Sequence, residues 1–199
     1  MRDRCARITA SLVAAGSTIC ILMLTGLPAH GFAQEIDPLQ VEAQVGLPVR
    51  LRIPSIKVNS VIEYVGVTSS GAMDVPKKDL NVGWYSPGTR PGEPGSAVIA
   101  GHYSWRNHAQ GGIFNNLDQL RKGDILYIDD VQGNTLTFVV RENRIFKYDA
   151  DARQVFSSSS GTRLNLITCA GWWDSSKQSS TSRRVVFTEL VPQIPTNFS

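Results

Sequence analysis

One cysteine, one histidine and one arginine lie at the ends of apolar segments in this chain. Cys169 ends the apolar run at residues 164–169, His102 closes the run at 96–102, and Arg183 opens a third run. A thiolate attacks carbonyl carbon, and it needs a neighbouring base or cation to form near neutral pH. An imidazole supplies acid/base catalysis, and a guanidinium stays charged and stabilises a developing oxyanion. The three side-chain types therefore predict a thiol-dependent acyl-transfer site.

Each of these residues also has an ordinary structural explanation. A single cysteine in an apolar strand is most often a small buried hydrophobe. A histidine after a glycine is commonly a surface residue, and Arg183 and Arg184 can be solvated charges at a strand end. A zinc site made of Cys169, His102 and His108 is a further alternative, but one cysteine and two histidines at irregular spacing fit it poorly. The coincidence of all three residue types at strand ends favours the catalytic interpretation.

Short apolar segments separated by turn signals occupy most of the chain. Strands are expected at residues 49–53, 56–58, 61–65, 96–102, 125–128, 135–148, 164–169 and 183–191. One helical turn is expected at 114–120, and the polar segments 149–162 and 170–182 are expected to be loops. Many short strands with little helix are typical of a closed β-barrel or a sandwich.

The first 33 residues have the pattern of a secretory signal or a membrane anchor. Three arginines precede an uncharged apolar stretch at residues 8–27, and small residues at 31 and 33 offer a cleavage site. The stretch is also long enough to span a bilayer, so both cleavage and retention stay open. The folded domain is expected outside the cytoplasmic membrane. The expected division is a signal or anchor at 1–33, a linker at 34–48, a catalytic barrel at 49–192 and a tail at 193–199.

Charge and cysteine usage exclude some classes of function. The 199 residues include 20 basic and 17 acidic side chains. Without residues 1–33, which hold three basic and one acidic side chain, 17 and 16 remain, and this balance gives no electrostatic footprint for nucleic acid. Cys5 and Cys20 fall in the N-terminal segment, so the domain has one thiol and no internal disulfide. A lone thiol in an exported protein is buried, paired between molecules, or reactive.

Five segments in order resemble the sortase family, the cysteine transpeptidases that join secreted proteins to the cell envelope. They are LRIPSI at residues 51–56, GSAVIAGH at 95–102, FNNL with LRKGD at 114–124, LITC at 166–169 and RRVV at 183–186. The resemblance covers about residues 49–191, nearly the whole exported domain. It implies a mainly β fold, a closed eight-stranded sortase-type β-barrel with one or two short helices.

The resemblance also implies roles for individual residues. Cys169 matches the nucleophile, His102 the acid/base, and Arg183 the residue that stabilises the oxyanion and positions the substrate. Arg183 is preferred to Arg184 because the family's arginine is followed by one variable residue and then an apolar strand. Side chains alternate along a strand, so only one of the two arginines should face the groove. Thr168 is expected to support the site as a substrate-binding residue next to the nucleophile.

The reaction that the resemblance implies has two stages. A C-terminal sorting signal of the Leu-Pro-x-Thr-Gly type is cleaved between its last two residues, and the thioester is resolved by an amine of a cell-wall precursor or another protein, or by water. The implied partners are therefore secreted proteins with a sorting motif, the amine acceptor, and the membrane through the N-terminal segment. No metal and no organic cofactor is implied. Some relatives use calcium held by acidic loops, but Asp149 and Asp151 are too few acids to predict a site.

Two features bear on the subclass and on substrate binding. Residues 34–49 are short for the lid segment of pilin-polymerising sortases, which favours a general-purpose enzyme of class D, E or F type. Trp172 and Trp173 follow the nucleophile, and Trp105 lies three residues after His102. These tryptophans either cap the barrel end or wall a groove for an apolar peptide, and as groove residues they are candidates for substrate binding.

Other classes of protein fit less well. An L,D-transpeptidase is disfavoured because its Ser-His-Gly-Cys arrangement is absent, and a papain-like peptidase places its cysteine before its histidine. A predominantly hydrolytic cysteine peptidase remains an alternative, because hydrolysis and transfer share one acyl-enzyme. A non-catalytic sortase-like barrel that binds envelope peptides is the alternative without enzyme activity. The presence of all three polar residues favours an enzyme.

Overall fold

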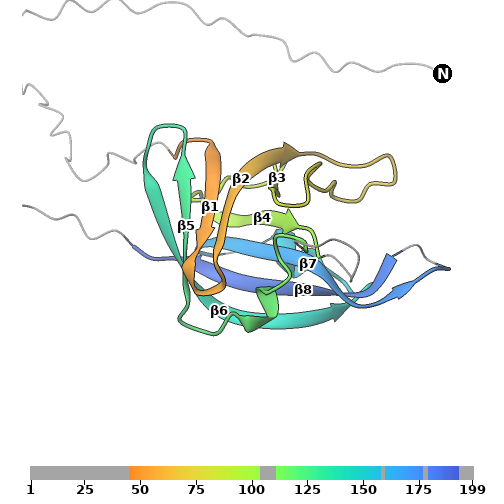
Figure 1. Ribbon diagram of the computed structural model, residues 1–199. Coiled ribbons are helices and arrows are strands. Elements are labelled where there is room, and N and C mark those ends of the chain that lie inside the picture. Colours follow the sequence, from red (N-terminus) through yellow and green to blue (C-terminus); the bar gives the residue numbers. More distant parts are fainter. Residues whose placement is uncertain (1–44, 104–110, 158–159, 177–178, 193–199) are drawn as a thin grey trace, which may run out of the picture. The chain divides into compact units, whose positions relative to one another are not determined.

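The computed structural model describes residues 45–103, 111–157, 160–176 and 179–192. In this part of the chain, eight strands form a closed barrel in the order β1-β2-β3-β4-β7-β8-β6-β5 (Figure 1). The strands are β1 (Pro48–Ile53), β2 (Val58–Val65), β3 (Val82–Tyr85), β4 (Gly95–Gly101), β5 (Ile125–Asp130), β6 (Thr135–Lys147), β7 (Thr162–Asp174) and β8 (Ser179–Leu190). The predicted closed eight-stranded β-barrel is confirmed.

Two parallel pairs interrupt an otherwise antiparallel barrel. β2 pairs with β3 and β4 pairs with β7 in parallel, while β1 pairs with β5 and closes the barrel. β8 lies between β7 and β6, so the last strand of the described residues is flanked by two earlier ones. The β4–β7 pair brings the segment that precedes His102 beside the segment that carries Cys169.

Alternation along β7 separates the barrel interior from its outer face. Leu164 and Leu166 are fully buried in the interior apolar cluster. Ile167 faces outward and packs on a second cluster that includes Val155 and Val185. Such alternation is what a strand with one face in the core requires. The outer face of β4, β7 and β8 is therefore an apolar surface in its own right.

Three short helical segments accompany the strands in the described residues. They are the 3-10 turns η1 (Pro54–Ile56) and η2 (Leu117–Gln119) and the helix α1 (Arg153–Phe156). The helical turn predicted at 114–120 corresponds to η2. The expected loop at 149–162 instead contains α1, which docks on the sheet through buried Val155 and through a 2.6 Å hydrogen bond from the Asn165 side-chain amide to the Val155 carbonyl. Four residues are too short to show a helical period, so no sequence pattern predicts α1.

The loop predicted at residues 170–182 is shorter in the structure than the sequence indicates. β7 continues to Asp174 and β8 already begins at Ser179, so Cys169 lies inside a strand rather than at its end. The ladder shifts register between Ala170 and Trp173, and Gly171 takes a left-handed φ of 78° at the shift. The serines and threonines of this hairpin suggested a loop, yet their backbones pair as a ladder. Figure 1 shows the hairpin extending past the other strands.

Several expectations fall outside the described residues. They concern the signal or anchor at 1–33, most of the linker at 34–48, the tail at 193–199, and the side chains of Trp105 and His108. Within the residues that the structure describes, no helix is long and apolar enough to cross a membrane.

Candidate active site

Cys169 and Arg183 are direct partners across the antiparallel β7–β8 ladder. Directly opposite residues on antiparallel strands project from the same face of a sheet. Val185, two residues after Arg183, packs in the outer apolar cluster, so this shared face is the outer surface of the barrel. Cys169 is half-buried and its thiol is free. The strand pairing thus places the two residues opposite each other, and both line one groove.

His102 reaches the level of Cys169 through the parallel β4–β7 ladder. That ladder runs from the Gly95–Thr162 pair to the Ala100–Ile167 pair, always with the same offset. The Thr168 hydroxyl continues it by donating a 2.8 Å hydrogen bond to the carbonyl oxygen of Gly101. His102 and Cys169 have the same separation, two positions beyond the last pair of the ladder, but His102 is not among the residues that line the groove beside Cys169.

Gly101 explains why the histidine faces outward. A Cβ atom at Gly101 would collide with the ring of Phe114, a fully buried core residue. The glycine therefore permits close approach of the strand to the core, and it marks the inward-facing position. Because side chains alternate, His102 is directed to the outer face, where Cys169 lies.

The imidazole is held by the long loop between β2 and β3. The Nε2 atom of His102 lies 2.8 Å from the carbonyl oxygen of Pro76. A carbonyl only accepts hydrogen bonds, so Nε2 carries a proton and Nδ1 is left for proton exchange. This contact fixes the tautomer of the ring as well as its position.

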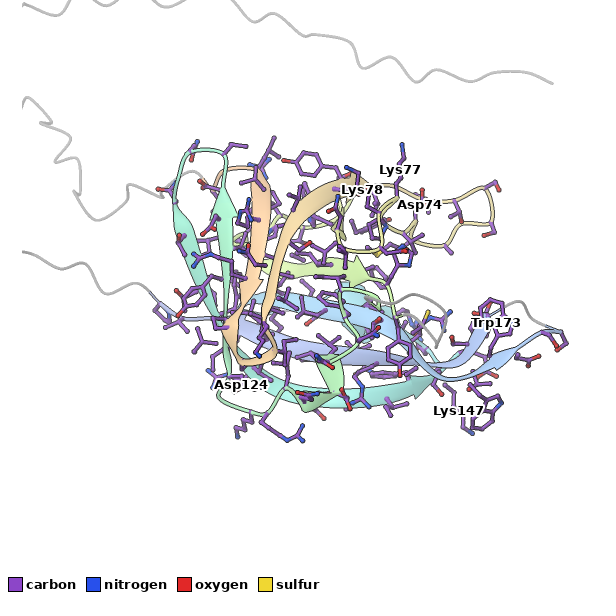
Figure 2. All side chains as sticks on the ribbon, in the orientation of Figure 1. Asp74, Lys77, Lys78, Asp124, Lys147 and Trp173 are labelled. Carbon is purple, nitrogen blue, oxygen red and sulfur yellow. The ribbon has the colours of Figure 1, made fainter. Side chains whose placement is uncertain are left out.

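Glu63 anchors the same loop to β2. Its carboxylate accepts 2.8 Å hydrogen bonds from the backbone N–H of Lys77 and from the Asn81 side chain. The bond from Lys77, assisted by Asn81, holds the pKa of Glu63 below its ordinary value despite partial burial. Lys77 directly follows Pro76, so the anchor acts one residue from the carbonyl that holds His102. Figure 2 shows Lys77 and Lys78 on this loop.

The Arg183 guanidinium is fixed by its own strand. Nη1 donates to the carbonyl oxygens of Ser180 and Ser182 at 3.0 and 2.9 Å, and Nη2 donates to the Ser179 hydroxyl at 2.8 Å. The guanidinium also lies over the ring of Tyr148, 5.2 Å from its centre. A cation held by backbone acceptors and an aromatic face is oriented before any substrate arrives.

Arg184 takes a different direction. It pairs with Thr168 in the ladder, whereas Arg183 pairs with Cys169. Its Nη1 atom donates a 2.8 Å hydrogen bond to the Asn143 side chain on β6. Strand alternation therefore gives the two arginines different surroundings, and only Arg183 shares the face of the thiol.

A groove with a volume of about 300 Å³ passes Cys169 and Arg183 on the outer face. Its floor and walls are mostly aliphatic and aromatic, from Met73, Val75, Phe146, Phe156, Ile167 and Val185. The walls come from the β2–β3 loop on one side and from the segment between β6 and β7 on the other. Figure 2 places Asp74 on the first of these and Lys147 at the end of β6.

The predicted substrate-binding residues occupy different places. Thr168 is 4% exposed, lines the groove next to Cys169, and holds the β4 end through Gly101. Trp172 and Trp173 are 70% and 59% exposed on the hairpin beyond Gly171, outside the lining of the groove. Figure 2 shows Trp173 on this hairpin. Trp105 lies outside the described residues.

Sequence reasoning missed the loop residues that complete the site. Pro76 contributes a backbone carbonyl, and Tyr148 contributes a ring face to Arg183. Neither kind of contact leaves a pattern in a single sequence. In residues 45–103, 111–157, 160–176 and 179–192 no group of three or more His, Cys, Asp or Glu side chains is arranged to hold a metal ion.

Comparison with known proteins identifies the family. The family model described as "Sortase domain" matches residues 51–191, and no curated protein matches the chain. Sortase C-1 from Actinomyces oris is 27% identical over 73% of this chain and 76% of that one, with a TM-score of 0.58. A lid mutant of sortase A from Corynebacterium diphtheriae is 22% identical over 82% and 79%, with a TM-score of 0.58. The Clostridium perfringens sortase D5 transpeptidase is 21% identical over 73% and 79%, with a TM-score of 0.54. The chain belongs to the sortase family.

Proposed function

We propose that this protein is an extracytoplasmic cysteine transpeptidase that cleaves a Leu-Pro-x-Thr-Gly-like C-terminal sorting signal and transfers it to an amine of the cell envelope. The observation that supports the proposal is the strand register. Cys169 pairs with Arg183 across β7 and β8, and the β4–β7 offset, continued two positions past its last pair, matches His102 to Cys169. Cys169 and Arg183 line an apolar groove, and so does Gly101, which directly precedes His102.

Acylation uses each residue in turn. His102 takes the proton of the Cys169 thiol, and the thiolate attacks the threonine carbonyl carbon of the sorting signal. Arg183 stabilises the oxyanion that forms on the carbonyl oxygen. The C–N bond to glycine then breaks, the imidazolium returns its proton to the leaving amine, and a thioester remains on Cys169.

Deacylation reverses the proton transfers. A neutral amine attacks the thioester carbon, a C–N bond forms, and the C–S bond breaks with its electron pair returning to sulfur. His102 accepts the proton that the attacking amine loses. Water in place of the amine gives hydrolysis through the same acyl-enzyme, so the two outcomes differ only in which nucleophile arrives.

The groove suits the apolar part of such a signal. Its volume of about 300 Å³ lies at the small end of ligand pockets, large enough for a few apolar side chains. Leucine and proline of the signal would bury against its aliphatic and aromatic walls. Residues 49–192 form the catalytic domain in this proposal, and residues 1–33 export or anchor it.

Intact-mass spectrometry tests the proposal directly. The full chain is incubated with a library of Leu-Pro-x-Thr-Gly-like peptides, with and without oligoglycine or diaminopimelate-type amines, beside Cys169→Ala as control. We expect a thioester adduct on the wild-type chain that passes to an amine, and none on the variant. A folded protein with an alkylatable Cys169 that forms no adduct with any peptide would contradict catalysis and leave the peptide-binding alternative.

A further inference from the structure

Cys169 borders a second hollow besides the groove. The groove has a volume of about 300 Å³ and this hollow about 120 Å³, and their linings have only Thr168 and Cys169 in common. The hollow is formed by residues 168–171 of β7, by the segment around η2, and by β6 and β8 residues. Cys169 therefore borders two separate spaces.

The chemistry of the two spaces differs. The groove is walled mainly by aliphatic and aromatic side chains, whereas the small hollow is bordered by two residues of opposite charge, Asp118 and Arg184. Tyr103 and Asn115 add further polar groups to its rim. An acid and a base around one small space complement a ligand that carries both signs of charge.

A hydrogen-bond network holds the two charges in place. Asn143 on β6 accepts a 2.8 Å hydrogen bond from Arg184 through its side-chain oxygen. Its side-chain nitrogen donates to the carbonyl oxygens of Leu117 and Leu120 at 3.0 and 3.1 Å, which fixes the η2 turn that carries Asp118. One asparagine thus ties the arginine to the turn that carries the carboxylate.

The charges are available to a ligand, and the space is small. Among the ion pairs of the described residues, none joins Asp118 to Arg184. A volume of about 120 Å³ corresponds to about four water molecules at ~30 Å³ each. This is enough for the end group of a side chain or an amino acid, and too little for a peptide signal.

We propose that this hollow is the acceptor site, and that it binds an amine whose carbon also carries a carboxylate. The inference rests on the proposed function, since it assigns the second substrate of the same reaction. Arg184 pairs with the carboxylate, and Asp118 attracts the ammonium form and leaves the amine beside the thioester. The bound ammonium gives one proton to water, and its nitrogen lone pair forms the C–N bond to the acyl carbon. The C–S bond breaks and releases the thiolate of Cys169, and His102 accepts the proton that the new amide nitrogen loses.

The acceptor site is tested by measuring how one acyl-enzyme divides between transfer to an amine and hydrolysis by water. The full chain is acylated with a Leu-Pro-x-Thr-Gly-type peptide, glycine or glycinamide is added at equal concentration, and the ratio of amide product to hydrolysed product is read by mass spectrometry. Glycinamide keeps the amine and replaces the negatively charged carboxylate with a neutral amide. Because both products come from the same thioester, the ratio does not depend on how fast the thioester forms.

Arg184→Gln is expected to lower the glycine ratio by about 10-fold or more, the usual worth of a hydrogen bond to a charged group, and the glycinamide ratio by less than about 3-fold. Arg184→Lys keeps the positive charge and should retain the preference for glycine. Asp118→Asn should lower both ratios. Arg141→Gln is the matched control, because Arg141 pairs with Glu189 and does not border the hollow.

The outcomes separate the two proposals. A thioester that forms and partitions in Arg184→Gln as in the wild type overturns the acceptor site alone. Equal losses for glycine and glycinamide overturn recognition of the carboxylate. Absence of a thioester with every peptide overturns the proposed function, and the acceptor site falls with it.

Discussion

The Nε2 atom of His102 and the carbonyl oxygen of Pro76 are 2.8 Å apart, which joins the proposed acid/base to the loop between β2 and β3. The loop is anchored in turn by Glu63, which accepts the backbone N–H of Lys77. The geometry of the imidazole therefore depends on a carboxylate that does not itself touch the thiol. Glu63 is a positioning residue in this arrangement.

Glu63→Gln should slow acylation with little effect on peptide affinity. The glutamine amide brings a donor toward the Asn81 side-chain amide, so one of the two anchoring bonds is lost. Loss of about 1 kcal/mol of loop anchoring corresponds to an acylation rate roughly 5-fold lower. Single-turnover kinetics across a range of peptide concentrations measures this. Glu142→Gln on β6, whose partner is Arg144, is the control and should behave as wild type.

The same substitution should change how stability depends on pH. The pKa of Glu63 lies below its ordinary 4.5, first because of the Lys77 hydrogen bond. A lowered folded-state pKa contributes stability that is present above the ordinary pKa and is lost as pH falls through the folded-state value. The difference in melting temperature between wild type and Glu63→Gln should therefore shrink as the pH is lowered below 4.5. A difference that stays constant from neutral to acid pH would contradict the linkage.

Cys169→Ala should abolish turnover without unfolding the barrel. The thiol is half-buried on the outer face, outside the interior cluster, so the free energy of unfolding should change by less than about 1 kcal/mol. Loss of a nucleophile lowers activity by at least about 1,000-fold. Thermal denaturation and peptide cleavage, measured on the same sample, separate the two effects. Cleavage at the wild-type rate would contradict the assignment of the nucleophile.

Arg183→Ala and Arg184→Ala should affect thioester formation very differently. Arg183 shares the outer face with Cys169, and loss of an oxyanion donor costs about 100-fold or more. Arg184 faces Asn143 and should have a much smaller effect on this first stage. Rates of adduct formation by rapid-quench mass spectrometry decide between them. The reverse ranking would move the oxyanion role by one residue.

Gly101→Ala, a substitution at the residue directly before His102, should lower the free energy of unfolding of the barrel. The added methyl group meets the Phe114 ring, and overpacking of a core costs about 1–3 kcal/mol. The double variant Gly101→Ala, Phe114→Leu should recover part of this loss, because the smaller side chain makes room. Chemical denaturation of the two single variants and the double variant gives the coupling between the sites. Additive losses would contradict the contact.

The barrel could be predicted from the sequence because apolar and polar residues alternate along its strands and because glycine and proline mark its turns. The separation between His102 and Cys169 can also be read from the sequence, and it equals the offset of the β4–β7 pairs. The separation alone does not predict that β4 and β7 are parallel neighbours. Strand ends were harder, since the serine-rich hairpin after Cys169 has the composition of a loop and the backbone pairing of a ladder. The groove walls depend on loop conformation, which follows from tertiary packing rather than from local propensity.

The position of β8 has a consequence for when the site comes into being. It is the last strand in the described residues, yet it inserts between β7 and β6, and it brings Arg183. Until the ribosome has added residues 179–190, β6 and β7 lack the neighbour they share and the barrel stays open. The chain between β6 and β8 includes α1 and β7, so their pairing forms more slowly than a hairpin does, and exposed strand edges invite wrong pairings during the delay. Cys169 gains Arg183 as its ladder partner when β8 pairs with β7, and the barrel closes when β8 also pairs with β6.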